Sequence, residues 1–269
     1  MVTVARHREL LEKLGLHTLA GVRSFRGDLV KNHKGRRDIS RIRVTESGGF
    51  ERVFYLKRSW KPYKKDGLAS LLRHGKVWSI SRVEWENSLA LERSGLRVAA
   101  PVAFGEECGA FWETFSFIIT EAAAGRQTLD QFLRECGEPS ERRRVFDALA
   151  LEIRRLHDAG LASPDLFARH IFVDATAHPP QFCLIDMARL DRAQPVSNLL
   201  RARDLAALNI TALTRFVSTK ERVRFLRLYA GSRRKQLMRM VRRRMEHLLG
   251  RRKFRHFLEP DSADVPVTS

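Results

Sequence analysis

The stretch that most constrains the fold is residues 161–189, LASPDLFARHIFVDATAHPPQFCLIDMAR. It contains two short apolar runs, HIFVD at residues 170–174 and FCLID at residues 182–186, on either side of a polar turn with two prolines. Runs of this length that are rich in β-branched and aromatic residues predict β-strands, and the proline-containing turn between them predicts a β-hairpin.

The predicted hairpin would gather three chemically useful side chains. Asp165 stands in the loop just before the first strand. We expect a register in which Asp174 pairs with Phe182. That register places His170 opposite Asp186, and opposed residues in an antiparallel ladder lie about 4.5–5.5 Å apart. The imidazole and this carboxylate should therefore be neighbours.

This order of groups is typical of the catalytic segment of protein kinases. There, a base Asp is followed five residues later by an Asn, and an Asp that holds Mg²⁺ follows a short hairpin. Asp165, His170 and Asp186 stand at these three places, with His170 where the Asn would be. An ordinary surface hairpin can also begin and end with an exposed aspartate, so the remainder of the chain must decide between the two interpretations.

The composition describes a soluble globular protein. The chain has 269 residues, 43% of them hydrophobic and 30% charged, which suits one large domain or two lobes. Its three cysteines, Cys108, Cys136 and Cys183, form neither a CxxC pair nor an even disulfide set, so we expect a reducing compartment and no zinc site. No apolar run is long enough for a signal peptide or a membrane span, which predicts a cytoplasmic protein.

The net charge of +19 is concentrated near the carboxyl end. Between Arg201 and Arg255 there are 18 Lys and Arg residues against three acidic residues. Such a segment attracts polyanions, namely nucleic acid, anionic lipid head groups or a phosphorylated substrate. The alternative is a solvated helical face with no partner.

The amino-terminal half reads as a sheet with a helix inserted. A short helix is expected at residues 8–14, followed by strands at 29–32, 39–44, 53–57, 101–104 and 115–120. In a kinase the turn between the first two of these strands would cover the nucleotide phosphates. The turn at residues 33–38 has one glycine and three cations, so it is a weak glycine-rich loop.

Lys57 ends the third of these strands, where a kinase lysine neutralises the α/β-phosphates and is braced by a helix glutamate. The next helix is expected from about Ser81 to Gly95, with Glu84 and Glu86 as candidate partners. Two residues apart on a helix, they point about 200° away from each other, so only one can face Lys57. Strand lysines and helix glutamates also commonly face solvent.

The run EAAAG at residues 121–125 would connect two lobes, and small residues there leave room for an adenine ring beside the backbone of Glu121 and Ala123. Alanines are also common wherever two segments of a chain cross at close distance, so these residues alone do not establish an adenine site. Further on, amphipathic helices are predicted at residues 140–157, 199–214, 220–229 and 236–249. A basic insert follows Lys57 at residues 61–65 and 68–75, and residues 260–269 are expected to be disordered.

Several segments in order resemble the lipopolysaccharide core kinases of the Kdo/WaaP (heptose kinase) family. They are FYLKRSW, RVEWENSLALERSGLRVAAPVAFGEE, FSFIITEAAAGRQTLDQFL, RLHDAG with SPDLFARHIFV, LIDMARL and RFLRLYAG, covering roughly residues 25–232. The family's Glu-Trp dipeptide falls on Glu84-Trp85, which is why Glu84 is preferred over Glu86. Where family members commonly read His-Arg-Asp, this chain reads Ser163-Pro164-Asp165.

The resemblance implies an α+β, two-lobed protein-kinase-like fold, with the N-lobe at residues 1–121 and the C-lobe at residues 122–259. It implies ATP-dependent phosphorylation of an inner-core sugar, heptose or Kdo, on a lipid-linked precursor at the cytoplasmic face of the inner membrane. Anionic glycolipid and the membrane surface are then the expected partners, and nucleic acid is not.

The implied roles can be assigned residue by residue. Lys57 would hold the ATP phosphates with Glu84 bracing it, and the backbone of Glu121 and Ala123 would meet adenine. Asp186, with His170, would bind Mg²⁺, and Asp165 would accept the proton of the sugar hydroxyl. Asp204 matches a position that supports the catalytic loop in kinases.

Two other functions remain compatible with these residues. One is a kinase-fold enzyme that phosphorylates another small molecule or a protein. The other is a non-catalytic pseudokinase module whose basic surface docks nucleic acid or a membrane.

Overall fold

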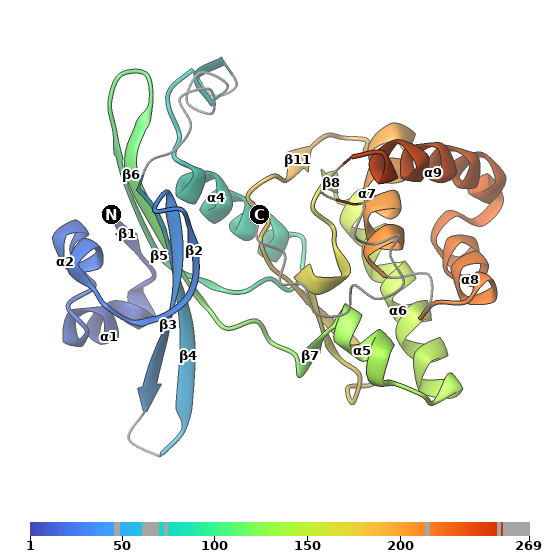
Figure 1. Cartoon of the computed structure of the whole chain (residues 1–269), viewed down its shortest axis with the longest axis horizontal. Coiled ribbons are helices and arrows are strands. Elements are labelled where there is room, and N and C mark those ends of the chain that lie inside the picture. Colours follow the sequence, from blue (N-terminus) through green and yellow to red (C-terminus); the bar gives the residue numbers. More distant parts are fainter. Residues whose placement is uncertain (46–48, 61–69, 73–74, 213–215, 252–253, 255–269) are drawn as a thin grey trace. The chain divides into compact units, whose positions relative to one another are not determined.

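The computed structural model describes residues 1–45, 49–60, 70–72, 75–212, 216–251 and 254, and Figure 1 shows its elements. The chain divides into two units, the first formed by Met1–Ala90 with Ala99–Ala122, and the second by Leu91–Val98 with the described residues from Ala123 onward. The lobe boundaries expected from the sequence remain a prediction. Most of the expected basic insert and all of the expected disordered tail lie outside the described residues.

The first unit is built on a six-stranded antiparallel sheet in the order β1-β5-β6-β4-β3-β2 (Figure 1). Its strands are β1 (Val2–Thr3), β2 (Asp28–His33), β3 (Arg37–Thr45), β4 (Glu51–Ser59), β5 (Pro101–Cys108) and β6 (Glu113–Glu121). The strands expected from β-branched and aromatic runs are confirmed and are longer than predicted. β1 was missed because two residues carry no periodic pattern.

Alternation along β4 gives the sheet two different faces. Phe54 and Leu56 pack on one face against α1 (Arg8–Lys13) and α2 (Leu19–Ser24). Lys57 points to the opposite face, as does its cross-strand neighbour Ile118, because successive strand residues alternate. On that face Trp85 of α4 (Ile80–Arg93) packs against Ile118, so α4 lies on the same side as Lys57.

The amino end of α4 is held by glutamates of the β5–β6 hairpin. Glu113 Oε2 accepts a hydrogen bond from the Ile80 N–H at 3.0 Å, and Glu106 Oε2 accepts one from the Ser79 N–H at 3.2 Å. Carboxylates are favourable at this end of a helix because the first N–H groups have no partner within the helix and the helix dipole is positive there. These contacts orient α4 relative to the sheet.

The second unit is mainly helical. Its helices are α5 (Leu129–Glu135), α6 (Pro139–Asp158), α7 (Asn198–Thr211), α8 (Thr219–Ala230) and α9 (Arg234–Leu249). The apolar face predicted for residues 140–157 is confirmed, since Val145, Leu149 and Ile153 of α6 are each at most 1% exposed. Short strands complete the unit: β7 (Gln127–Thr128), β8 (Leu161–Ala162), β9 (Ile171–Asp174), β10 (Gln181–Leu184) and β11 (Asp191–Arg192).

The predicted hairpin is β9–β10, but its predicted register was wrong by one residue. Asp174 pairs with Gln181, and the ladder ends with Ile171 opposite Leu184. This register sets the buried Val173 opposite the buried Phe182 and the partly exposed Asp174 opposite the partly exposed Gln181, whereas pairing Asp174 with Phe182 would have set a partly exposed carboxylate opposite a buried ring. A slip of one residue reverses the faces of a strand, so burial decided the register.

A buried ion pair joins the sheet of the first unit to α2. Arg58 Nε lies 2.8 Å from Asp38 Oδ1, and the side chains of Arg58 and Asp38 are 6% and 12% exposed. The guanidinium also donates to the carbonyl oxygens of Val22 and Phe25 at 3.0 and 2.9 Å. Removing the carboxylate would therefore leave a buried cation without its counter-charge.

We expect Asp38→Ala to lower the free energy of unfolding by about 3–5 kcal/mol, the usual result of breaking a buried ion pair on one side. Urea unfolding followed by tryptophan fluorescence measures this. Asp28→Ala is the control, because Asp28 is 60% exposed and pairs with Arg41 at 3.4 Å on the same sheet; it should cost less than about 1 kcal/mol. Equal losses in the two variants would contradict the assignment.

Candidate active site

Lys57 and Glu84 form an ion pair within the first unit. Lys57 Nζ on β4 lies 2.6 Å from Glu84 Oε1 on α4, and the two side chains are 26% and 10% exposed. The pairing expected from the sequence is therefore present, and it involves Glu84 rather than Glu86. The half-buried ammonium is held by a fixed carboxylate, an arrangement suited to binding a phosphate group.

Asp165 lies in the loop that follows β8 in the second unit. Its side chain is 16% exposed, and Arg189 Nη1 donates to both carboxylate oxygens at 3.1 and 3.2 Å. The sequence reasoning missed Arg189, although it closes the LIDMAR run three residues after Asp186. The Arg189 side chain is 62% exposed, so it places a solvent-accessible cation beside Asp165.

His170 connects the Asp165 loop to Asp186. Its Nδ1 lies 2.9 Å from the Asp165 carbonyl oxygen, and because a carbonyl only accepts, Nδ1 is the donor. In the neutral ring Nε2 then keeps its lone pair, accepts from Arg169 Nε at 3.3 Å and lies 3.9 Å from Asp186 Oδ2. Burial lowers the pKa of His170, outweighing Asp186, which raises it, so the neutral form is favoured.

Asp186 has an uncommon backbone conformation. Its φ is +58°, in the left-handed region, and Asp is one of the few residues other than glycine that tolerate it. The residue follows the end of β10, and its side chain is 52% exposed. Although the predicted register was wrong, the expected proximity of His170 and Asp186 is present because Asp186 leaves the strand direction.

The His170–Asp186 pair fits a divalent cation only in part. Within the residues that the structure describes, no group of three or more His, Cys, Asp and Glu side chains is arranged to hold a metal. Mg²⁺ is usually bound by one or two carboxylates together with substrate phosphates and water, so Asp186 suits it. The Nε2 lone pair of His170 accepts from Arg169 Nε at 3.3 Å, so it could supply a second ligand only in place of this hydrogen bond, and imidazole is a less usual partner for Mg²⁺.

The predicted adenine-contacting positions fall on both sides of the boundary between the units. Glu121 ends β6, its N–H donates to the Ala100 carbonyl at 2.9 Å, and its carboxylate pairs with Arg52 at 3.0 Å. Ala123 belongs to the second unit, as do Asp165, His170 and Asp186. The structure thus groups Lys57 with Glu84 in the first unit, and Asp165 with His170 and Asp186 in the second.

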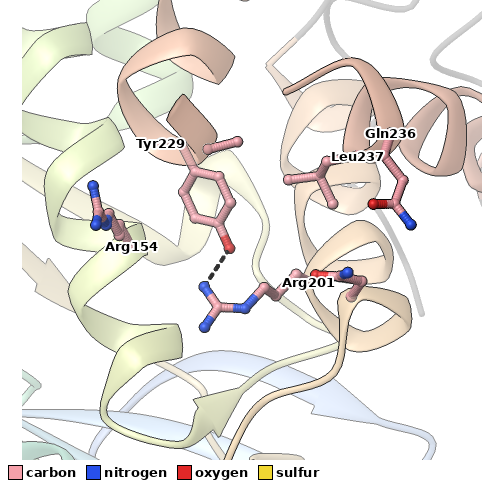
Figure 2. Close-up of a pocket in the computed structure, with 7 residues that line it drawn as sticks. Arg154, Arg201, Tyr229, Gln236 and Leu237 are labelled. Atoms are coloured by element: carbon pink, nitrogen blue, oxygen red, sulfur yellow. Dashed lines mark hydrogen bonds between the residues drawn. The ribbon is translucent and has the colours of Figure 1, made fainter. Parts of the chain in front are cut away.

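Two of the cavities in the described part of the second unit differ in character. One, of about 20 Å³, is bounded by polar and apolar side chains that include Arg154, Arg201 and Tyr229 (Figure 2). It has room for little more than a water molecule. The other has a volume of about 270 Å³ and is lined mainly by apolar side chains of α5 to α9, with Arg222 among them.

The state of His170 predicts a dependence of stability on pH. Because its pKa is lowered in the folded state, the unfolded chain binds more protons between that lowered pKa and the ordinary value of 6.5. Its contribution to the free energy of unfolding is therefore complete above about pH 6.5 and is lost as the pH falls below it.

We expect the melting temperature of the wild type to fall more steeply on acidification than that of His170→Asn. Thermal unfolding of both proteins from about pH 8 to pH 5 measures the difference. Both proteins keep the other histidines, including His7, whose pKa burial also lowers. The difference between the two curves therefore reports on His170. Parallel curves would show that His170 is not the group responsible.

The comparison with known proteins agrees with this geometry. Residues 21–229 match the model of the lipopolysaccharide kinase (Kdo/WaaP) family. Over 223 residues the chain is 26% identical to the lipopolysaccharide core heptose(I) kinase WaaP of Pseudomonas aeruginosa, which covers 80% of this chain and 81% of that protein.

A solved structure of WaaP in complex with acyl carrier protein is also similar to the chain. The TM-score is 0.67 at 24% identity, covering 92% of this chain and 98% of that one. At this identity the likeness shows the fold, and it confirms the predicted α+β, protein-kinase-like fold. Because the family model spans most of the chain, the protein belongs to the lipopolysaccharide kinase (Kdo/WaaP) family and is a kinase.

Proposed function

We propose that this kinase transfers the γ-phosphoryl group of ATP to a hydroxyl of an inner-core sugar of lipopolysaccharide. The observation that carries the proposal is the grouping of Asp165, His170 and Asp186 around one hairpin, each within hydrogen-bond or ion-pair reach of the next. The activity named for the Pseudomonas relative supports heptose over Kdo as the acceptor.

Lys57 and Glu84 account for nucleotide binding. The ammonium would neutralise the α/β-phosphates, and Glu84 at 2.6 Å fixes where that charge is presented. Phosphoryl transfer depends mainly on positioning and charge neutralisation, so a rigid cation contributes directly to it. The backbone of Glu121 and Ala123 would bind adenine.

Asp165 would orient the sugar hydroxyl and accept its proton. Arg189 donates to both oxygens of this carboxylate, yet an ionised carboxylate offers about four acceptor positions, so about two remain for the hydroxyl and other donors. Arg189 thereby fixes the orientation of the base and adds positive charge close to the transferred group. Mg²⁺, held by Asp186 with His170, would supply charge neutralisation on the ATP phosphates.

We expect Asp165→Asn to lower kcat by about 10²- to 10⁴-fold with little change in the KM for ATP, because the general base is lost and binding is not. Phosphate transfer from labelled ATP to a heptose-containing lipopolysaccharide precursor measures this. Asp174→Asn is a matched control on the same hairpin, since the Asp174 carboxylate accepts from Thr176 in the turn at the end of β9, away from the loop that carries Asp165. Unchanged turnover in Asp165→Asn would contradict the role of Asp165 as the base, whereas a wild type without turnover would favour the non-catalytic binding module.

Metal binding can be tested separately from turnover. ATP should raise the melting temperature of the wild type more with Mg²⁺ than without it, because a ligand that binds only the folded state stabilises it. Asp186→Ala should lose the Mg²⁺-dependent part of the increase and keep the remainder. His170→Asn, which restores the usual kinase residue, should keep both parts. A full Mg²⁺ effect in Asp186→Ala would contradict the assignment.

The basic surface of α8 and α9 supports a peripheral contact with an anionic membrane. Leu237, Val241 and Leu248 of α9 are buried in the core of the second unit, so this apolar stripe is used within the protein. The exposed cations on the other side are Lys220, Arg227, Arg234, Lys235, Arg239, Arg242 and Arg243. We therefore propose electrostatic contact without insertion, and among the described helices none has the length and hydropathy to cross a bilayer.

We expect the double variant Arg242→Glu with Arg243→Glu to bind phosphatidylglycerol vesicles at least about tenfold more weakly than the wild type. Each cation near such a surface contributes about 1 kcal/mol, and reversal replaces attraction with repulsion. Co-sedimentation at low and high salt measures this. Arg8→Glu with Lys13→Glu, on exposed positions of α1, is the control. Equal losses in both double variants would show a non-specific charge effect.

Acyl carrier protein is a second candidate partner, because WaaP has been solved in complex with it. The apolar cavity of about 270 Å³ in the second unit is concave and apolar enough to receive an acyl chain. We propose that the cavity binds the chain of such a carrier. Binding assays with acylated and unacylated carrier protein distinguish this contact from one made by surface charge alone.

A further inference from the structure

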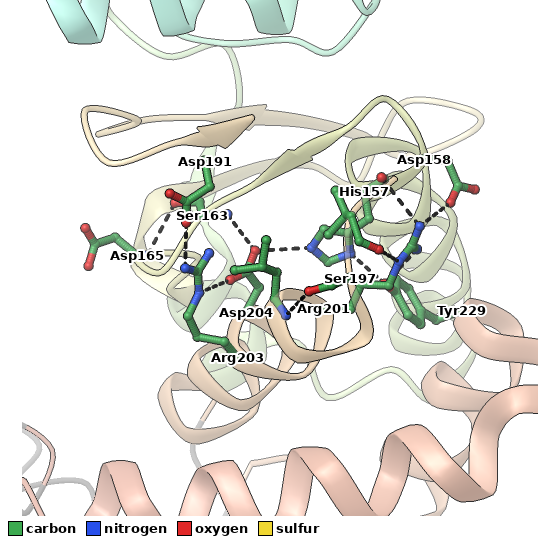
Figure 3. A network of polar contacts seen from close by, with 12 residues as sticks. His157, Asp158, Ser163, Asp165, Asp191, Ser197, Arg201, Arg203, Asp204 and Tyr229 are labelled. Atoms are coloured by element: carbon green, nitrogen blue, oxygen red, sulfur yellow. Dashed lines mark hydrogen bonds and ion pairs between the residues drawn. The ribbon is translucent and has the colours of Figure 1, made fainter. Parts of the chain in front are cut away.

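A buried carboxylate accepts a hydrogen bond from the loop that carries Asp165. Asp204 of α7 is 0% exposed, and its Oδ2 accepts the Ser163 N–H at 2.5 Å (Figure 3). Ser163 Oγ in turn accepts the Asp165 N–H at 3.3 Å. Arg203 Nε donates to Asp204 Oδ1 at 2.8 Å, so each Asp204 oxygen has a partner. The position of the proposed base therefore depends on where Asp204 is held.

A buried histidine also forms a hydrogen bond with Oδ2 of Asp204. His157 Nε2 of α6 lies 3.2 Å from Asp204 Oδ2, and the imidazole is fully buried. An ionised carboxylate only accepts, so Nε2 must carry the proton. In a neutral ring Nδ1 is then an acceptor that needs a donor, because an unsatisfied buried nitrogen is costly.

Tyr229 of α8 supplies that donor. Its hydroxyl lies 2.6 Å from His157 Nδ1, and Arg201 Nη1 donates to the same hydroxyl at 3.1 Å (Figures 2 and 3). Because Arg201 can only donate, the hydroxyl proton is directed to His157. Burial raises the pKa of Tyr229 to about 12, so the hydroxyl keeps this proton at physiological pH.

We propose that Tyr229 is a positioning residue for the reaction: it fixes the Nε2–H tautomer and orientation of His157, and thereby holds Asp204 and the Asp165 loop. The proposal rests on the proposed function, in which Asp165 is the base, and adds a residue that is linked to Asp165 by hydrogen bonds through His157, Asp204 and Ser163. Loss of one such hydrogen bond typically costs about 0.5–1.5 kcal/mol, which corresponds to about 2- to 10-fold in a rate.

The test is Tyr229→Phe, which removes the hydroxyl and keeps the ring. We expect kcat for the lipopolysaccharide precursor to fall about 2- to 10-fold with the KM for ATP unchanged. Asp147→Asn is the matched control, because Asp147 of α6 also bonds α8, through Arg224 at 2.6 Å. It should lower the melting temperature and leave kcat within about twofold of the wild type. Equal losses of kcat in the two variants would overturn the proposal, since packing of α6 on α8 would then explain both.

The route through His157 has its own test. If Tyr229 acts only through this ring, the double variant His157→Gln with Tyr229→Phe should have the kcat of His157→Gln alone. Losses that multiply would overturn the proposed route.

A readout without turnover separates this proposal from the proposed function. In Tyr229→Phe the Ser163 amide should exchange with solvent faster than in the wild type, and in Asp147→Asn it should not. Unchanged exchange and unchanged kcat in Tyr229→Phe overturn the positioning role. Unchanged kcat in Asp165→Asn overturns the role of Asp165 as base in the proposed function, and the Ser163 exchange then still decides whether Tyr229 holds the loop.

Discussion

The structure of both units depends on one constraint: a charged group removed from water must be paired or fully hydrogen bonded. In the second unit Asp204 satisfies it with the Ser163 N–H, His157 and Arg203, which together hold the Asp165 loop. In the first unit the Arg58–Asp38 pair ties the sheet to α2 next to Lys57. Buried charged groups thus hold the loop that carries Asp165 and the strand that carries Lys57.

Support of this kind suits the chemistry of phosphoryl transfer, which relies on placement more than on reactive groups. Lys57 forms an ion pair with Glu84, and Glu84 lies on α4. The amino end of this helix is supported by Glu106 and Glu113, which bind its N–H groups. Asp165 is presented by a loop that is bonded to α7. Function therefore resides in a few side chains, and the hydrogen bonds behind them determine where these side chains lie.

The excess positive charge of the chain has a different structural meaning from the one that composition alone suggests. The amphipathic pattern of α9 could have described a helix lying in a membrane surface. Its apolar stripe instead completes the core of the second unit, through Leu237, Val241 and Leu248. What remains at the surface is a set of cations, which favours electrostatic contact with an anionic partner.

Most elements of the fold could be predicted because their apolar residues repeat with the period of a strand or a helix. The strands around Lys57 and the long amphipathic helix α6 are examples. The elements that were missed include α2 and the two-residue strands β1, β7, β8 and β11, which are short and lack such a repeat. The hairpin register was wrong because both runs are apolar throughout, so burial in three dimensions, rather than alternation, selected the pairing.

By itself the sequence determined the candidate residues: motif order and spacing indicated Lys57, Asp165, His170 and Asp186, and the resemblance to the family chose Glu84 over Glu86. It could not show that Arg189 binds Asp165, or that Tyr229 reaches His157, because these contacts join residues that are 24 and 72 positions apart. Only the tertiary structure decided them, since side chains distant along the chain meet when helices pack. The physical reason is that spacing along a strand or helix sets which residues share a face, whereas packing sets which faces meet.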